Sequence, residues 1–137
     1  MEIAFVDTNL FIRYITQDNP GQAQKAQQIF QQVKTGARIV TASESVISEC
    51  VYVLSSKALY HLPRERIGTA LTILLSLKGF KLPRKRVYLR ALSLYASSTL
   101  DFVDALSVAQ MEHAKISTLL SFDQGFDRVQ GITRREP

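Results

Sequence analysis

Residues 1–11, MEIAFVDTNLF, begin the hydrophobic core of the protein and end its first expected strand on an acid. The apolar run at residues 3–6 is short and uninterrupted, which is typical of a buried strand in a parallel sheet. Asp7 ends this run and is followed by Thr8 and Asn9. A carboxylate next to the core is costly unless another group pairs with it, so the rest of the sequence must supply a partner for Asp7.

The composition favours one globular domain over residues 1–137. The chain has 137 residues and is 46% hydrophobic, which is enough for a substantial core. Its 17 basic and 12 acidic residues give a net charge of +5, which favours a polyanionic partner.

The sequence also indicates an intracellular, cytoplasmic protein. Its single cysteine, Cys50, cannot form an intrachain disulfide. The first residues do not form a signal peptide, because Asp7 interrupts the first apolar run. No apolar stretch is long enough to cross a bilayer, so no membrane association is expected.

Apolar spacing and capping signals predict strands that alternate with helices. Strands are expected at residues 3–6, 39–41 and 116–121, with an edge strand at 131–133 and a loop or short helix at 122–129. Helices are expected at residues 22–33, 43–57, 63–77, 82–96 and 101–114. This order predicts an α/β fold, a three-layer sandwich in which helices flank a mostly parallel sheet.

Four acids lie where such a fold gathers its ligand-binding residues. Asp7 follows the first strand and Asp123 follows the strand at 116–121, and ligand crevices lie at the carboxyl ends of parallel strands. Glu49 borders the apolar stripe of its helix, and Asp104 lies in the first turn of the helix at 101–114. We therefore expect these four side chains to converge.

Convergence of several carboxylates has an energetic consequence. Two unit charges 4 Å apart repel by about 4 kcal/mol at an effective dielectric constant of 20. A domain is stable by only roughly 5–15 kcal/mol. Either some of the acids stay protonated or a cation lies among them. Oxygen ligands without histidine or cysteine suit a hard divalent ion, Mg²⁺ or Mn²⁺.

Each acid also has an ordinary structural explanation. Asp101 can cap the helix at 101–114, and Asp104 then lies where the helix dipole favours an acid. Glu49 can be a half-exposed helix residue, and Asp123 can cap the turn that follows it. Thr8 and Asn9 can cap the next helix, or support Asp7 and a metal-bound water through hydrogen bonds.

Four stretches in this order resemble PIN-domain ribonucleases, and more narrowly the VapC toxins of type II toxin–antitoxin systems. They are FVDTNLFIRYIT, SESVISECVYVL, ALSLYASSTLDFVDALSVAQ and LLSFDQGF, and together with the element order they span essentially the whole chain. The resemblance implies a Rossmann-like PIN-domain sheet and a cytoplasmic toxin. It also implies an RNA substrate, a cognate antitoxin protein and a homodimer.

The resemblance further implies that Asp7, Glu49, Asp104 and Asp123 bind divalent metal and support RNA hydrolysis. Asp101 matches an additional acid of many DFxDA versions of the family. Ser121 departs from the family pattern, which commonly has threonine there; because the hydroxyl is retained, we expect only a small effect on the alignment of Asp123 and no loss of activity. The metal is expected to polarise a phosphate oxygen and activate water, with the ribose 3′ oxygen as leaving group.

A basic stretch, KLPRKR, is a candidate RNA contact. It places positive charges at the start of a helix, where they oppose the helix dipole by about 0.3–1 kcal/mol each. An external anion such as the RNA backbone would compensate these charges, although a solvated face is the simpler explanation for any one of them. The candidate residues are Lys81, Arg84, Lys85 and Arg86.

Two other functions are compatible with parts of the pattern. A phosphatase of the haloacid dehalogenase type also has an aspartate after its first strand, but it needs a second acid two residues later, where this chain has Asn9. A catalytically decayed PIN fold could bind RNA or protein without cleaving it. The presence of all four acids argues against such decay.

Overall fold

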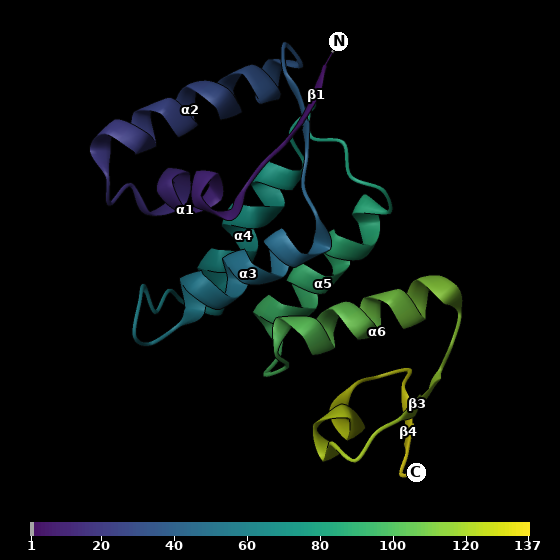
Figure 1. Cartoon of the computed structure of the whole chain (residues 1–137). Helices are drawn as coiled ribbons and strands as arrows, with labels where there is room; N and C mark the ends of the chain where they lie inside the picture. The colour runs from purple at the N-terminus through teal and green to yellow at the C-terminus, as the bar shows by residue number, and fades with distance from the viewer. Residues whose placement is uncertain (1) are drawn as a thin grey trace.

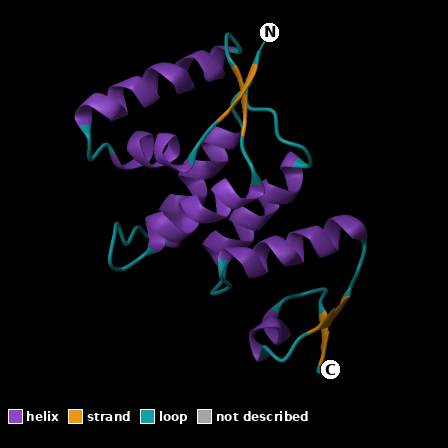
Figure 2. Cartoon of the chain, viewed as in Figure 1, coloured by secondary structure: helices purple, strands orange, loops and turns teal. Residues whose placement is uncertain are grey.

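The computed structural model describes residues 2–137. It consists mainly of helices, with a few short strands (Figure 1, Figure 2). In chain order the elements are β1 (Ile3–Phe5), α1 (Thr8–Thr16), α2 (Pro20–Thr35), β2 (Ile39–Thr41), α3 (Glu44–Ser55), α4 (Arg64–Leu75), α5 (Lys85–Ser97), α6 (Phe102–Ala114), β3 (Thr118–Leu120), the 3₁₀ helix η1 (Gln124–Arg128) and β4 (Thr133–Arg135).

The strands form two small parallel sheets. In one, β1 pairs with β2, so that Ile3 lies opposite Ile39, and in the other β3 pairs with β4. The expected α/β class and parallel pairing are confirmed, but within residues 2–137 the strands form two separate pairs instead of one continuous sheet. Consequently Phe5 of β1 and Leu120 of β3 are exposed.

A close backbone approach fixes the outer side of β2. The Val40 amide donates to the Gly79 carbonyl, and the Lys81 amide donates to the Val40 carbonyl. A side chain at Gly79 would place its Cβ 2.1 Å from the Arg38 carbonyl oxygen, so only glycine fits there. This bridge also fixes where the basic stretch beginning at Lys81 leaves the core.

Most helix boundaries follow the capping signals. The Asn19 side chain accepts a hydrogen bond from the Gln22 amide at 3.1 Å, and α2 ends at Gly36 with φ of 83°. Ser43 caps α3 in the same way by accepting from the Val46 amide at 3.1 Å.

Several element boundaries differ from the expected ranges, among them the following three. Helix α1, to which the apolar spacing assigned no range, begins directly after Asp7. Helix α5 begins at Lys85 rather than at residue 82, because Arg84 adopts a left-handed conformation with φ of 54°. Strand β4 lies at Thr133–Arg135 rather than 131–133, because these residues pair with β3.

The core lies between the helices and the β1–β2 sheet. Phe11 of α1 is fully buried, with its ring centroid 5.7 Å from Phe30 and 5.9 Å from Phe80. Helix α5 packs against both α4 and α6, and α3 contacts both α1 and α6. The unit formed by β3, η1 and β4 lies beyond α6 at the C-terminal end (Figure 1). No helix among residues 2–137 is both long and apolar enough to span a membrane.

We predict that Phe11→Ala lowers the free energy of unfolding by about 3–5 kcal/mol, because it opens a cavity between two other rings. Equilibrium denaturation in urea measures this value. Leu59→Ala is the control, since Leu59 is 58% exposed and its removal should change stability by no more than about 0.5 kcal/mol. Equal losses in the two variants would contradict the burial of Phe11.

Candidate active site

Three of the four predicted acids come from neighbouring elements. Asp7 follows β1 and occupies the N-cap position of α1. Its side chain accepts no capping hydrogen bond from the helix backbone. Glu49 lies on α3, and Asp104 lies in the first turn of α6. Because α3 contacts both α1 and α6, the packing of helices brings these elements to one region.

Asp7 and Glu49 both raise the pKa of the same buried thiol, that of Cys50. Cys50 is completely buried on α3, and burial is the main cause that raises its pKa. The negative charges of Glu49 and Asp7 raise this pKa further. The two acids are therefore close enough to Cys50 to influence it, and Cys50 itself stays an unreactive thiol.

The other three acids gather around the start of α6. Burial raises the pKa of Asp104, and the charges of Asp101 and Asp123 add to this effect. Asp101 occupies the N-cap position of α6, but its side chain makes no capping hydrogen bond. Asp101 thus occupies the cap position without making the capping hydrogen bond, and its carboxylate is available for another interaction.

Asp123 is held by two local hydrogen bonds. Its Oδ1 accepts from the Gly125 amide at 2.8 Å, so it caps η1. The Asp123 amide donates to the Ser121 hydroxyl oxygen at 2.9 Å. Ser121 thus contacts the backbone that carries Asp123.

No basic side chain among residues 2–137 forms a salt bridge with these acids. The salt bridges among residues 2–137 join Arg13 to Asp18, Arg90 to Glu112, and Arg134 to Asp127 and Glu136. None of them involves Asp7, Glu49, Asp101, Asp104 or Asp123. The chain has 17 basic residues, yet this part of it carries carboxylates without cationic partners. Uncompensated oxygen ligands of this kind fit a hard divalent cation.

The acids do not form one compact ligand set. Within the described chain, no three histidine, cysteine or acidic side chains lie close enough to hold one ion together. The charges instead act in two groups: Asp7 and Glu49 near Cys50, and Asp101, Asp104 and Asp123 at the start of α6. The shared ion expected from the sequence therefore stays a prediction.

The supporting residues lie beside the acids. Thr8 is 5% exposed in the first turn of α1, and Asn9 follows it on the surface. Neither Thr8 nor Asn9 occupies the cap position, which Asp7 takes.

The basic stretch reaches the same helix as Asp104. Arg84 lines a cavity together with Ser107, which lies one turn after Asp104 on α6. Lys81, Arg84 and Arg86 are exposed. Lys85 donates instead to the Phe80 carbonyl, and burial with the nearby charge of Lys81 lowers its pKa. Lys85 is thus partly occupied, whereas the other three cations face solvent.

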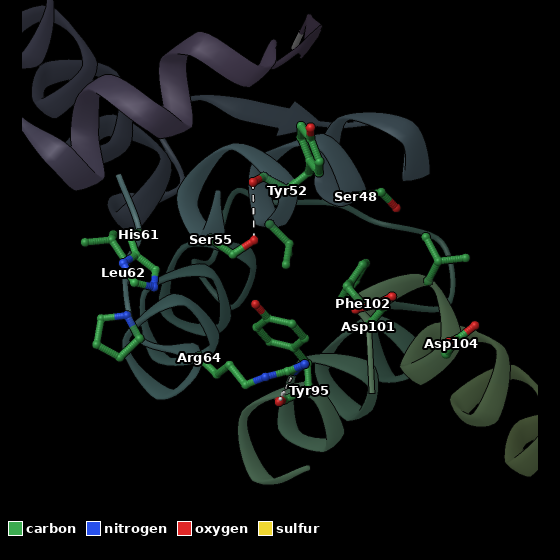
Figure 3. A pocket seen from close by; sticks show the side chains of 13 residues that line it. Ser48, Tyr52, Ser55, His61, Leu62, Arg64, Tyr95, Asp101, Phe102 and Asp104 are labelled. Atoms are coloured by element: carbon green, nitrogen blue, oxygen red, sulfur yellow. Dashed lines mark hydrogen bonds between the residues drawn. The ribbon is translucent and has the colours of Figure 1, made fainter. Parts of the chain in front are cut away.

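The larger cavity on the other side of the α6 start contains residues that the sequence did not single out. Besides Asp101 and Asp104, which the sequence did single out, it is lined by residues of α3 and α5 that include Ser55 and Tyr95 (Figure 3). Tyr95 falls on the buried stripe of α5, where an aromatic residue is indistinguishable from core by spacing alone.

Comparisons with known proteins identify the family of the chain. A family model described as PIN domain matches residues 4–132. The chain belongs to the PIN-domain family. The chain is also 29% identical over 131 residues to a VapC ribonuclease of Mycobacterium bovis and, to the same extent, to ribonuclease VapC13 of Mycobacterium tuberculosis. Each alignment covers 94% of this PIN-domain chain and 96% of the relative.

We predict that Asp104→Asn makes the protein more stable than the wild type at neutral pH in EDTA. Because the folded state raises the pKa of Asp104, ionisation of this group disfavours folding above that pKa. The advantage of the variant should shrink as the pH falls toward 3.8, the ordinary value, where both states take up the proton. Thermal unfolding between neutral and acid pH measures this difference.

Asp127→Asn is the control, for which we expect the opposite change in stability. A hydrogen bond from Arg134 lowers the pKa of Asp127, so its charge stabilises the fold at neutral pH and this contribution is lost on acidification. The control should therefore be less stable than the wild type at neutral pH. A loss of stability in Asp104→Asn under the same conditions would contradict the repulsion among the acids.

Proposed function

We propose that this protein is a divalent-metal-dependent endoribonuclease that hydrolyses phosphodiester bonds in RNA. The observation that carries the proposal is the set of acids on α3 and at the ends of β1, α6 and β3 that form no salt bridge among residues 2–137. Membership of the PIN-domain family and relatives named VapC ribonuclease support it.

Asp7, Glu49, Asp104 and Asp123 would hold Mg²⁺ or Mn²⁺, with Asp101 as an additional acid. When bound, such an ion supplies Lewis acidity, which polarises a phosphate oxygen and favours deprotonation of the attacking water. Carboxylate oxygens are the ligands that these ions prefer, so the type of donor atom suits the ion. Because no three of these side chains lie close enough within residues 2–137 to hold one ion, binding would have to draw the acids closer together.

The remaining residues orient the acids and the substrate. Ser121 accepts the hydrogen bond from the Asp123 amide and so directs that carboxylate. Thr8 and Asn9 adjoin Asp7 at the start of α1 and would support its carboxylate. Lys81, Arg84, Lys85 and Arg86 would contact RNA phosphates near α6, and the three exposed cations among them are the stronger candidates.

The biological setting follows from the resemblance to VapC toxins. A cognate antitoxin protein would hold the enzyme inactive, the chain would form a homodimer, and its substrate would be cytoplasmic RNA. One PIN domain over residues 1–137 would carry the whole activity. Membership of the PIN-domain family argues against the phosphatase alternative, and the assay below separates a nuclease from a decayed binding module.

We expect the purified chain, free of antitoxin, to cleave RNA with Mg²⁺ or Mn²⁺ and to stop in EDTA. Asp7→Asn and Asp104→Asn should each lower the cleavage rate by about a hundredfold or more, because each removes a proposed ligand. Electrophoresis of a labelled RNA measures the rate and shows whether the products end in a 3′ hydroxyl.

Glu65→Gln is the matched control. Glu65 also lies in the first turn of a helix, α4, and it is exposed, so its variant should cleave at the wild-type rate. Cleavage that continues in EDTA, or full activity in both Asp7→Asn and Asp104→Asn, would overturn the proposed function.

A further inference from the structure

A cavity of about 650 Å³ adjoins the start of α6 (Figure 3). Ser48 and Ser55 of α3 line one side, and Tyr95 of α5 lies across from them. Asp101 and Asp104 line the side next to the proposed ion-binding acids. A cavity of this size accommodates a ligand as large as a nucleotide base with its sugar.

Tyr95 presents an unpartnered hydroxyl to this cavity. The residue is only 4% exposed, and its hydroxyl has no hydrogen-bond partner among residues 2–137. Within the described chain, every side-chain oxygen or nitrogen that is fully buried has a hydrogen-bond partner. The Tyr95 hydroxyl oxygen is therefore not fully buried. The hydroxyl must therefore open onto the cavity, and Figure 3 shows it directed toward Ser55. A buried side chain with one polar atom free in a cavity is typical of ligand recognition.

The Tyr95 ring is held in place from behind. The Arg64 guanidinium lies 4.1 Å from the ring centroid. It donates hydrogen bonds to the carbonyl of Tyr95 at 3.1 Å and to that of Leu100 at 2.7 and 2.6 Å. Phe102 packs against the ring in an edge-on arrangement. The hydroxyl thus has a fixed position, which lowers the entropic cost of using it to bind a ligand.

Two of the other polar groups of the cavity offer hydrogen-bond acceptors, while Ser48, Tyr52 and His61 also line it. Ser55 donates its proton to the Tyr52 carbonyl at 3.2 Å, so its oxygen is left to accept. The Asp101 carboxylate can only accept. Adenine, guanine and cytosine each carry an exocyclic amino group that such acceptors can bind, whereas uracil has none.

An aromatic side chain lies at the rim. Tyr52 lines the cavity and is 71% exposed, so its ring is available to a base from solvent. Proteins that read single-stranded RNA combine aromatic stacking with hydrogen bonds to base edges, and this cavity offers both.

We propose that this cavity binds an unstacked RNA base next to the cleaved phosphodiester, with Tyr95 and Ser55 selecting a base that carries an amino group. The inference rests on the proposed ribonuclease function, because it assigns a base to a cavity that adjoins the acids. It names Tyr95 as a specificity residue and Arg64 as the residue that positions it.

The test measures binding of short oligo(A), oligo(C), oligo(G) and oligo(U) by fluorescence anisotropy in EDTA, where no metal-dependent cleavage occurs. The wild type should bind oligo(U) most weakly. Tyr95→Phe keeps the ring against Arg64 and removes only the hydroxyl. It should raise Kd for the tighter-binding oligonucleotides about fivefold, the equivalent of one hydrogen bond, and leave oligo(U) unchanged.

Tyr88→Phe is the matched control on the same helix. Its hydroxyl is 3.4 Å from Glu44, outside the cavity, so its loss should leave all four Kd values unchanged. If Tyr95→Phe does not fold, Ser55→Ala tests the opposite side of the cavity with the same expected loss of discrimination. Equal Kd values for the four oligonucleotides, no measurable binding, or identical behaviour of Tyr95→Phe and Tyr88→Phe would overturn the inference.

Cleavage assays then separate this inference from the proposed function. Cleavage by the wild type with unchanged base preference in Tyr95→Phe would overturn the base site and leave the nuclease intact. Base-selective binding without cleavage of any RNA would overturn the nuclease and leave the base site intact.

Discussion

Repulsion between carboxylates that lack a basic partner is the physical constraint on which this structure depends. Burial raises the pKa of Asp104, and the charges of Asp101 and Asp123 add to this effect; burial likewise raises the pKa of Cys50, and the charges of Glu49 and Asp7 add to it. The chain uses its salt bridges elsewhere, as between Arg134 and Asp127. A fold that keeps such charges uncompensated gains stability from any cation that binds them, and this links the site to its proposed ion.

The helical core explains how acids distant in sequence reach one region. Phe11, Phe30 and Phe80 fix α1 against the β1–β2 sheet, and α3 lies between α1 and α6. Asp7 and Asp104 lie where such elements begin or end and Glu49 lies in the middle of α3, so their backbone positions are set by core packing. The same packing leaves a cavity beside α6 in which the Tyr95 hydroxyl has no hydrogen-bond partner among residues 2–137. The proposed ion and the proposed base would thus lie side by side.

Local signals in the sequence predicted much of the fold and the elements that carry the acids. Helix α2 begins after the Asn19 cap and ends at Gly36, in keeping with local signals, because capping depends on a few adjacent residues. The pairing of strands was harder to predict, because it depends on contacts between distant segments, and the strands form two pairs. Arg84 also moved the start of α5, through a left-handed conformation that its side chain does not signal. Tyr95 escaped prediction because a buried aromatic at helical spacing has the pattern of a core residue.

Isothermal titration with Mn²⁺ tests the central claim most directly, because it measures the ion without substrate or turnover. We expect saturable binding to the wild type, an affinity at least about tenfold weaker in Asp104→Asn, and an unchanged affinity in Glu65→Gln. No saturable binding to the wild type, or equal affinity in all three proteins, would contradict the account that these carboxylates share a divalent ion.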